Sequence, residues 1–230
     1  GNRSLLDSLI IGVTTRITSA TNYIEQRDSI SHDMLEYIKM LGGIPLLLPN
    51  VCEKRSELIK ICDLIILSGG DDITHLPNGT LLERTVKKNI RDKVEYSVLD
   101  TCLSEKKPVM AICRGMQLVN LWFGGSLKIV DEELHVNKKH SVKILNNEFS
   151  DLLNTKRKNM VNSYHRYAIF KETLGKNLIP GIVASDNSIE AFVDINRKFF
   201  GVMWHPERDD GKFSINFNVI NKLLNIRSIK

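Results

Sequence analysis

The sequence has no uninterrupted apolar run near the roughly 20 residues that a membrane-spanning helix needs, so we expect no membrane association. Its first residues lack a long apolar segment followed by a small-residue cleavage site, and we expect no secretory signal peptide. Its four cysteines form neither a C-x-x-C pair nor a regular framework. These absences argue against a disulfide scaffold and make the reducing cytoplasm the expected compartment.

Aromatic residues are also few, at 7% of the chain, and their scatter argues against a stacking platform for bases. Internal repeats and low-complexity linkers are absent. The formal net charge of +5 is mild, and the short basic clusters at 87–88, 138–139 and 156–158 are more simply explained as solvated faces. We therefore predict no nucleic-acid partner, while a basic mouth for an anionic small substrate stays open.

What the sequence does contain is typical of an α/β protein. In the first half, short apolar runs at 9–14, 44–48, 63–67 and 108–112 alternate with helical patterns at 30–41, 56–62, 90–103 and 115–123. Continuous apolar strands that alternate with helices predict a mainly parallel sheet covered on both faces.

After residue 126 the pattern changes to strands with little helix between them, at 140–145, 160–163, 179–184, 189–196 and 198–204. These strands either extend the sheet or form a small antiparallel patch. An amphipathic helix is predicted at about 213–224. Because no linker interrupts the series, we expect residues 1–230 to form one domain.

The most informative segment is the apolar strand that leads directly into Cys113, just before a predicted helix. This strand–turn–helix order is that of a nucleophile elbow, which lifts a reactive side chain to the carboxyl edge of the sheet. The helix N-terminus favours a thiolate, Gly115 permits the close turn, and the backbone N–H of Arg114 faces a developing oxyanion. A plain core cysteine is the alternative, which the position at a strand exit disfavours.

A base for this thiol is predicted at the end of a later apolar strand. His205 and Glu207 stand two residues apart in extended chain around Pro206, so their side chains point to the same side. Glu207 is then placed to orient the imidazole and stabilise its protonated form.

Two further segments carry polar groups at strand ends. Gly69 and Gly70 follow the strand at 63–67, where their backbone N–H groups can bind an anion or complete an oxyanion hole. The run from Asn162 to Arg166 carries several hydrogen-bonding side chains. We assign no metal, because no cluster at ligand spacing accompanies Asp71 and Asp72, and we see no pattern in the remaining histidines, His32, His75, His135 and His140.

Together these motifs resemble class I glutamine amidotransferase-like proteins over nearly the whole chain. The matching segments are Ser68-Gly69-Gly70, Ala111-x-Cys113-Arg114-Gly115-x-Gln117, Asn162-Ser163-x-His165 and Trp204-His205-Pro206-Glu207. Within that superfamily, Cys-Arg-Gly resembles the free-standing γ-glutamyl hydrolase branch, of peptidase C26 type.

The resemblance implies a flavodoxin-like three-layer sandwich and a catalytic triad of Cys113, His205 and Glu207. It implies an oxyanion hole formed by the N–H groups of Gly70 and Arg114, and it implies no cofactor. The residues implied to bind the γ-glutamyl group are Gly69, Gln117, Asn162, Ser163, Tyr164, His165 and Arg166.

Two segments depart from the branch. The loop after Gly70 begins Asp71-Asp72-Ile73, where the branch more often carries a Pro–aromatic–Tyr-Gly sequence that shapes the leaving-group pocket. Relatives also tend to carry Gln two residues after the histidine of the third motif, where this chain has Tyr167. Both departures bear on the substrate and leave the nucleophile unaffected.

Three functions follow from this reading. The first is a free-standing hydrolase that releases glutamate from a small γ-glutamyl conjugate. The cations Arg84, Arg91 and Arg208 near the mouth loops favour a nucleotide amidate as its substrate, such as the γ-glutamyl-CDP-amidate of surface-polysaccharide modification. γ-Glutamyl-aminobutyrate or a γ-glutamyl polyamine is the alternative substrate. The second function is a glutaminase subunit that supplies ammonia to a separate synthetase. The third is a non-enzymatic binding relative, which the complete triad disfavours. A homodimer stays open because many relatives are dimers.

Overall fold

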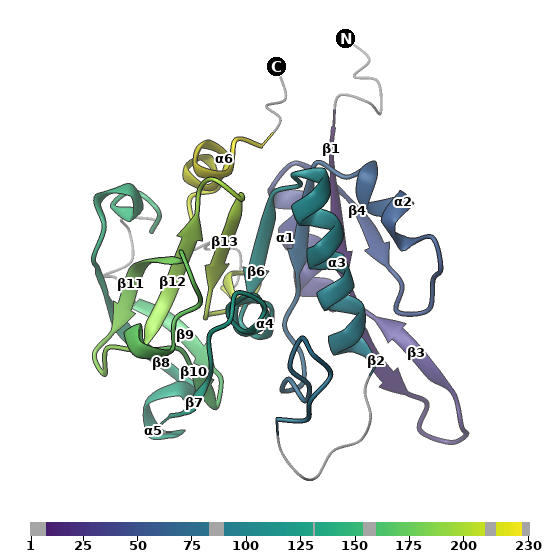
Figure 1. The fold of residues 1–230 in the computed structure, drawn as a ribbon, viewed down its shortest axis with the longest axis horizontal. Coiled ribbons are helices and arrows are strands. Elements are labelled where there is room, and N and C mark those ends of the chain that lie inside the picture. Colours follow the sequence, from purple (N-terminus) through teal and green to yellow (C-terminus); the bar gives the residue numbers. More distant parts are fainter. Residues whose placement is uncertain (1–7, 83–89, 131, 154–159, 210–214, 227–230) are drawn as a thin grey trace.

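A sheet of nine strands runs through the computed structural model, in the order β4-β1-β5-β6-β13-β12-β11-β8-β9 (Figure 1). The structure describes residues 8–82, 90–130, 132–153, 160–209 and 215–226. No helix among these residues is long and apolar enough to cross a membrane.

The first five strands of this order are parallel to one another. They are β4 (Gly43–Leu48), β1 (Leu9–Thr14), β5 (Leu64–Leu67), β6 (Val109–Ile112) and β13 (Phe199–Val202). The residues of β5, β6 and β13 are all buried, which explains why the sequence shows continuous apolar runs there rather than alternation.

The other four strands are antiparallel to their neighbours and extend the sheet, which decides between the two arrangements left open above. They are β12 (Ile189–Asp194), β11 (Ile179–Ala184), β8 (Val136–Ile144) and β9 (Met160–Tyr164). The sheet is therefore mainly parallel at its centre with an antiparallel extension, as predicted.

Helices cover both faces of the sheet and bury two apolar cores. One core packs against α1 (His32–Met40) and α6 (Phe217–Leu224). The other packs against α2 (Arg55–Lys60), α3 (Arg91–Glu105) and α4 (Arg114–Trp122). This is the expected three-layer arrangement. The residues 213–214, with which the last predicted helix begins, lie outside the described part of the chain.

Several short elements were not predicted. Two antiparallel pairs lie outside the main sheet: β2 (Arg16–Ser19) with β3 (Gln26–Ser29), and β7 (Lys128–Ile129) with β10 (Tyr167–Ala168). A short helix, α5 (Glu132–His135), precedes β8. Turns of 3-10 helix lie at Asn147–Phe149, Lys171–Thr173 and Pro206–Arg208. These pieces are too short or too polar to leave a periodic pattern.

Candidate active site

The carboxyl ends of β5, β6 and β13 meet at one edge of the sheet. Leu67 pairs with Ala111, and Val202 pairs with Ile112, so the residues that follow these strands leave the sheet side by side. Segments that are distant in sequence, beginning at Ser68, Cys113 and Met203, are therefore brought together. Open α/β sheets bind ligands at this edge.

Cys113 forms the predicted elbow between β6 and α4. Its backbone lies at φ 51° and ψ −102°, which is strained for a residue with a side chain. The Cys113 N–H donates to the Val202 carbonyl at 2.8 Å, and its carbonyl accepts from the Gln117 N–H at 3.1 Å as α4 begins. The turn is thus held from the neighbouring strand and from the helix, and strain of this kind is concentrated at functional sites.

Gly115 lets α4 approach the sheet this closely. A Cβ at that position would lie 2.5 Å from the carbonyl oxygen of Leu67, which is closer than real Cβ contacts. The tight turn after Cys113 therefore requires glycine at 115 for reasons of packing rather than of φ.

His205 and Glu207 form a close pair beside Cys113. The Nδ1 atom of His205 lies 2.6 Å from Oε1 of Glu207, and both side chains are buried. The imidazole also interacts with the Cys113 thiol through a hydrogen bond and through charge. The three residues that the sequence predicted as a triad are thus in contact in the order thiol, imidazole, carboxylate.

The pKa values of this group favour an ion pair between Cys113 and His205. Burial opposes ionisation of Cys113, but the neighbouring imidazole outweighs it and lowers the pKa of the thiol. Burial likewise opposes protonation of His205, yet the Cys113 thiolate and the Glu207 carboxylate raise the pKa of His205 to about 9. Because each charge stabilises the other, the thiolate of Cys113 forms at a lower pH than that of an ordinary cysteine.

Gly69 lies against His205, whereas Gly70 lies against Arg91 and Arg16. A Cβ on Gly69 would be 2.5 Å from Cε1 of His205, so the glycine lets the loop lie on the imidazole. Gly70 has φ +153°. The Arg114 N–H belongs to the first turn of α4, where backbone donors have no partner within the helix. That the N–H groups of Gly70 and Arg114 form an oxyanion hole stays a prediction.

Beneath the glycine loop lies a network of buried charges that the sequence did not reveal. Arg114 forms ion pairs with Asp92 and Glu95 of α3, and all three side chains are buried. Arg91 contacts Glu95 at 3.2 Å and donates to the carbonyl and hydroxyl oxygens of Ser68 at 3.1 and 3.0 Å. The spacing of Asp92 and Glu95 on one helix was the available signal.

This network corrects one expectation about the mouth of the site. Arg91 was expected to favour a nucleotide as a cation near the mouth loops, but it is 2% exposed because its guanidinium group donates to Ser68 and pairs with Glu95. Arg84 lies outside the described residues. Arg208 is half-buried, with its guanidinium carbon 4.9 Å from the centre of the Tyr164 ring.

Arg16, on β2, adds a further cation near Glu207. It lines a small cavity together with Gly69 and Glu207. Burial, followed by the nearby Arg208 and Arg91, lowers the pKa of Arg16. Because like charges repel one another here, this side of the site favours an anionic ligand.

The predicted substrate-binding residues divide into two groups. Asn162 and Ser163 are buried and bind other parts of the protein. The side-chain amide of Asn162 donates to the backbone carbonyl of His205 and accepts from the backbone N–H of His205, both at 2.8 Å. The Ser163 hydroxyl donates to the backbone carbonyl of His135 at 2.7 Å. Asn162 therefore holds the backbone of the proposed base.

The remaining members of that set take different positions. Gln117 is buried and donates to the Tyr167 carbonyl at 3.2 Å. Tyr164 is exposed, and its ring meets the His205 ring edge-on with centroids 5.8 Å apart. Arg166 is exposed, whereas His165 is buried and faces Glu190. Their roles in binding the γ-glutamyl group stay predictions.

His135 and His140, in which the sequence showed no pattern, meet His165 and Glu190 in a buried group. The ligand atoms of the four side chains lie within 4.8 Å of one another. The sequence showed no pattern in these histidines, because the fold joins residues that are far apart in the chain, from α5, β8, β12 and the residue after β9.

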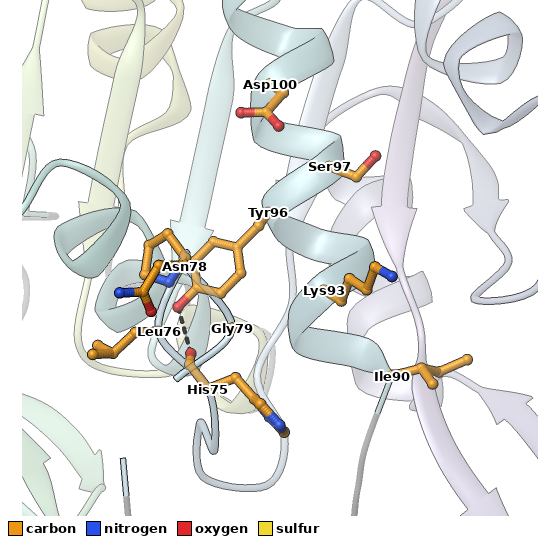
Figure 2. A pocket seen from close by; sticks show the side chains of 10 residues that line it. His75, Leu76, Asn78, Gly79, Ile90, Lys93, Tyr96, Ser97 and Asp100 are labelled. Carbon is orange, nitrogen blue, oxygen red and sulfur yellow. Dashed lines mark hydrogen bonds between the residues drawn. The ribbon is translucent and has the colours of Figure 1, made fainter. Parts of the chain in front are cut away.

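A cavity of about 610 Å³ lies between the loop at 75–79 and α3 (Figure 2). The loop is held to the helix by Asp92, whose carboxylate accepts from the N–H groups of Thr74 and His75, and by the Tyr96 hydroxyl, which donates to the His75 carbonyl at 2.8 Å. Asp92 also pairs with Arg114, beside the predicted nucleophile. Cys113, His205 and Glu207 do not line this cavity.

Comparison with known proteins decides the family. A family model described as Peptidase C26 matches residues 9–207, which include every strand of the sheet as well as Cys113, His205 and Glu207. The chain belongs to the Peptidase C26 family.

Two relatives are similar to this Peptidase C26 protein in sequence, and one solved structure is similar to it in fold. It is 31% identical to Gamma-glutamyl-CDP-amidate hydrolase of Campylobacter jejuni over 208 residues, which cover 88% of this chain and 92% of the relative. It is 30% identical to a subunit of the glutamine-hydrolyzing GMP synthase of Methanococcus aeolicus over 180 residues, which cover 76% of this chain and 80% of the relative.

The solved structure of a putative GMP synthase subunit from Thermoplasma acidophilum superimposes with a TM-score of 0.63 at 18% identity, covering 95% of this chain and 94% of that one. This likeness confirms the predicted flavodoxin-like α/β fold. As a member of Peptidase C26, the chain is an amide-bond hydrolase, as predicted.

Proposed function

We propose that this Peptidase C26 protein hydrolyses the γ-glutamyl amide bond of a small conjugate, with Cys113 as the nucleophile. The observation that supports the proposal is that the buried His205 interacts with both Cys113 and Glu207 at the carboxyl edge of the sheet. A thiol, an imidazole and a carboxylate in this order are what acyl transfer through a thioester requires.

The reaction proceeds in two steps. The Cys113 thiolate attacks the γ-carbonyl carbon, and the N–H groups of Gly70 and Arg114 stabilise the oxyanion. His205, protonated, gives its proton to the leaving nitrogen as the C–N bond breaks. His205 then takes a proton from water, which attacks the γ-glutamyl thioester and releases glutamate and the free Cys113. Glu207 keeps the imidazole oriented throughout.

The proposed leaving group is a nucleotide amidate. Two observations support it: the relative of 31% identity is named for γ-glutamyl-CDP-amidate, and the half-buried cations Arg16 and Arg208 lie on the Glu207 side of the site. Phosphate oxygens bind guanidinium groups through charge-assisted hydrogen bonds. A γ-glutamyl polyamine would bring further positive charge to the same place.

A glutaminase that delivers ammonia to a partner is the second candidate. It is favoured by the likeness to a GMP synthase subunit that carries the glutamine-hydrolyzing function in its name. Such a protein would prefer glutamine itself and would be slow without its partner.

A substrate panel tests both candidates. Glutamate release by the pure protein is measured with glutamine, γ-glutamyl-aminobutyrate, a γ-glutamyl polyamine and γ-glutamyl-CDP-amidate. We expect kcat/KM for the nucleotide amidate to exceed that for glutamine by at least about 100-fold, which corresponds to about 2.7 kcal/mol of transition-state binding. Slow turnover of glutamine alone would instead favour the partner-dependent glutaminase.

The nucleophile is tested in the same assay with Cys113→Ala. We expect the preferred activity to fall by at least about 10,000-fold, because the thioester cannot form, while the circular dichroism spectrum stays unchanged. Cys52→Ala is the matched control, since Cys52 is a half-buried cysteine that touches neither His205 nor Glu207, and it should keep full activity. Full activity in Cys113→Ala would refute the mechanism.

A further inference from the structure

Four buried polar side chains converge behind the predicted active site, on the antiparallel side of the sheet. They come from the last residue of α5, from β8, from the residue after β9 and from β12, and they are His135, His140, His165 and Glu190. Their exposures are 0%, 6%, 4% and 0%. Charged and polar groups buried so deeply need partners that satisfy them.

The inward atoms of the group are all potential ligands. From Oε1 of Glu190, Nε2 of His140 lies at 3.2 Å, Nε2 of His165 at 3.8 Å and Nδ1 of His135 at 3.8 Å. Within the described part of the chain, Nε2 of His140, Nε2 of His165 and both oxygens of Glu190 have no hydrogen-bond partner. Two imidazoles and a carboxylate thus direct unsatisfied atoms at one point.

The outward nitrogens explain why the inward ones are acceptors. Nδ1 of His140 faces the Ser141 carbonyl at 3.2 Å, Nδ1 of His165 faces the Tyr167 carbonyl at 2.8 Å, and Nε2 of His135 faces the Asp186 carboxylate at 2.6 Å. Carbonyl and carboxylate oxygens only accept, so the outward nitrogen of each ring carries the hydrogen. In neutral imidazoles the inward nitrogens then present lone pairs to the Glu190 oxygens.

Neighbouring hydroxyl groups do not relieve this arrangement. The Ser163 hydroxyl, 3.4 Å from Nδ1 of His135, donates its hydrogen to the His135 carbonyl at 2.7 Å. The Ser188 hydroxyl donates to Asp186 at 2.6 Å. Three lone pairs and a carboxylate that face one another require a shared cation, and the choice lies between protons on the rings and a metal ion.

The spacing of the four side chains fits a metal ion. Zinc bound at about 2.0–2.1 Å by nitrogen and oxygen ligands in a tetrahedron separates those ligands by about 3.3 Å. The separations from Glu190, 3.2 Å to His140 and 3.8 Å to His165 and His135, lie close to this value, and all four ligand atoms lie within 4.8 Å of one another, so an inward movement of the imidazoles would complete the shell. Metal-bound histidines also characteristically donate the other ring N–H to a carbonyl or carboxylate, as all three do here.

We propose that His135, His140, His165 and Glu190 form a closed structural site for a divalent transition metal ion, with Zn²⁺ as the best match. Three imidazoles and a carboxylate suit zinc by ligand type. The site is structural rather than catalytic because four protein ligands fill a tetrahedron and leave no position for substrate. The bound ion would link α5, β8 and the end of β9 to β12. It would lie close to Ser163, which hydrogen-bonds His135, and to Asn162, which hydrogen-bonds the backbone of His205.

Cobalt substitution of the whole chain tests the proposal. Chelator-treated protein is titrated with Co²⁺ and followed by visible absorption, and zinc in the untreated protein is measured by mass spectrometry. We expect one equivalent of Co²⁺ with the strong visible bands of a tetrahedral ion, displaced by Zn²⁺. The bands should persist in Cys113→Ala and should lack thiolate charge-transfer absorption, which would reveal binding at Cys113 and His205 instead.

Variants locate the metal. Asp186→Asn leaves all four ligands in place and alters a partly exposed residue, so folding should be preserved; removing this outer hydrogen bond should weaken Co²⁺ affinity about 10–100-fold. His140→Ala and Glu190→Ala should weaken it more. His32→Ala, an exposed histidine on α1, is the control and should bind normally.

The measurements also decide the opposite case. If His140→Ala or Glu190→Ala does not fold, X-ray absorption of the zinc-loaded wild type identifies the ligands, and imidazole with oxygen and no sulfur is expected. Failure of the wild type to bind Co²⁺ or Zn²⁺ would show a group held by protons and would overturn the proposal. Sulfur among the metal ligands would overturn it equally, and so would a Co²⁺ affinity that is unchanged both in Asp186→Asn and in a folded His140→Ala.

Discussion

The titration of Cys113 cannot be separated from that of His205, because each charged form is stabilised mainly by the other. Burial penalises both charges, yet the pKa of the thiol is lowered and the pKa of the imidazole is raised to about 9. Glu207 contributes on the side of the imidazolium. The active form is therefore the ion pair, which exists above the thiol pKa and below the imidazole pKa.

This coupling predicts a bell-shaped pH profile. We expect kcat/KM to fall at acid pH as Cys113 takes up its proton, and at alkaline pH near 9 as His205 loses the proton that the leaving group needs. In Glu207→Gln the negative charge that raises the His205 pKa is removed, so the alkaline limb should move to lower pH. Initial rates across the pH range measure both limbs.

A matched control separates this effect from a general change of charge. Glu57 is an exposed carboxylate of α2 that pairs with Lys60, and Glu57→Gln should leave the profile unchanged. An alkaline limb in Glu207→Gln at the wild-type position would mean that Glu207 does not act on His205.

Arg16 provides a residue-scale test of the leaving group. If its guanidinium group binds phosphate, Arg16→Ala should raise KM for γ-glutamyl-CDP-amidate by about 10-fold, the effect of one charge-assisted hydrogen bond worth about 1.5 kcal/mol. Hydrolysis of γ-glutamyl-aminobutyrate should change little. Arg27→Ala is the control, since Arg27 is an exposed arginine of β3, the strand paired with β2. An equal loss for both substrates would place Arg16 with the scaffold rather than with the nucleotide.

At the scale of elements, the position of α4 depends on its close approach to β5. Alanine in place of Gly115 gains up to about 1 kcal/mol of helix propensity. Its Cβ, however, would lie 2.5 Å from the backbone oxygen of Leu67, which cannot move like a flexible side chain. Because overpacking of this kind costs about 1–3 kcal/mol, the clash outweighs the propensity.

We therefore expect Gly115→Ala to lower the free energy of unfolding by about 1–2 kcal/mol, and to lower kcat because the elbow at Cys113 shifts with the helix. Chemical denaturation and initial rates measure the two effects. Ser97→Ala, on an exposed face of α3, should change stability by no more than about 0.5 kcal/mol. A Gly115→Ala protein as stable and active as the wild type would show that α4 can move away from β5 without consequence.

The elements that could be predicted are those in which the buried residues follow one another continuously or at a regular spacing in the sequence. The strands around Cys113 are buried on both faces, and α1 carries buried residues at helical spacing, so both leave apolar runs or periodicity. The β2–β3 pair was missed because its residues are mostly polar and exposed, and it lies outside the main sheet. Its stability comes from pairing, which single-sequence periodicity does not record.

The same reasoning explains which parts of the candidate site were foreseen. Cys113 directly follows β6, and His205 follows β13 closely, so the topology of a parallel sheet was enough to bring them together. Glu207 lies in the 3-10 turn Pro206–Arg208 rather than in the extended chain that was expected, and it still pairs with His205. The charge network of α3 and the group around Glu190 depend on side chains that meet across layers or antiparallel strands. His135, His140, His165 and Glu190 follow one another at intervals of 5, 25 and 25 residues, and no local spacing rule connects them.

Across the whole molecule, the two halves of the sheet are stabilised by different means. The parallel half is covered by helices on both faces and filled by apolar side chains. The antiparallel half ends in β8 and β9, where β9 is an edge strand of the main sheet, and its interior contains the buried group around Glu190. The proposed metal ion would supply a cross-link where apolar packing is replaced by polar side chains.

This division predicts where metal changes local stability. A metal ion that binds only the folded form slows hydrogen exchange at every amide that becomes exposed only when the metal site opens. It does not change exchange at amides that become exposed while the metal site stays intact. Amides of β8, β9 and β12 should therefore exchange hydrogen more slowly in zinc-loaded than in chelator-treated protein, by the factor that the binding constant sets. The exposed β2–β3 pair should exchange equally in both, because it opens without moving a ligand. Equal exchange of β8 and β9 in the two forms would mean that no ion ties this half of the sheet together, and the charges around Glu190 would then be balanced by protons on the histidines.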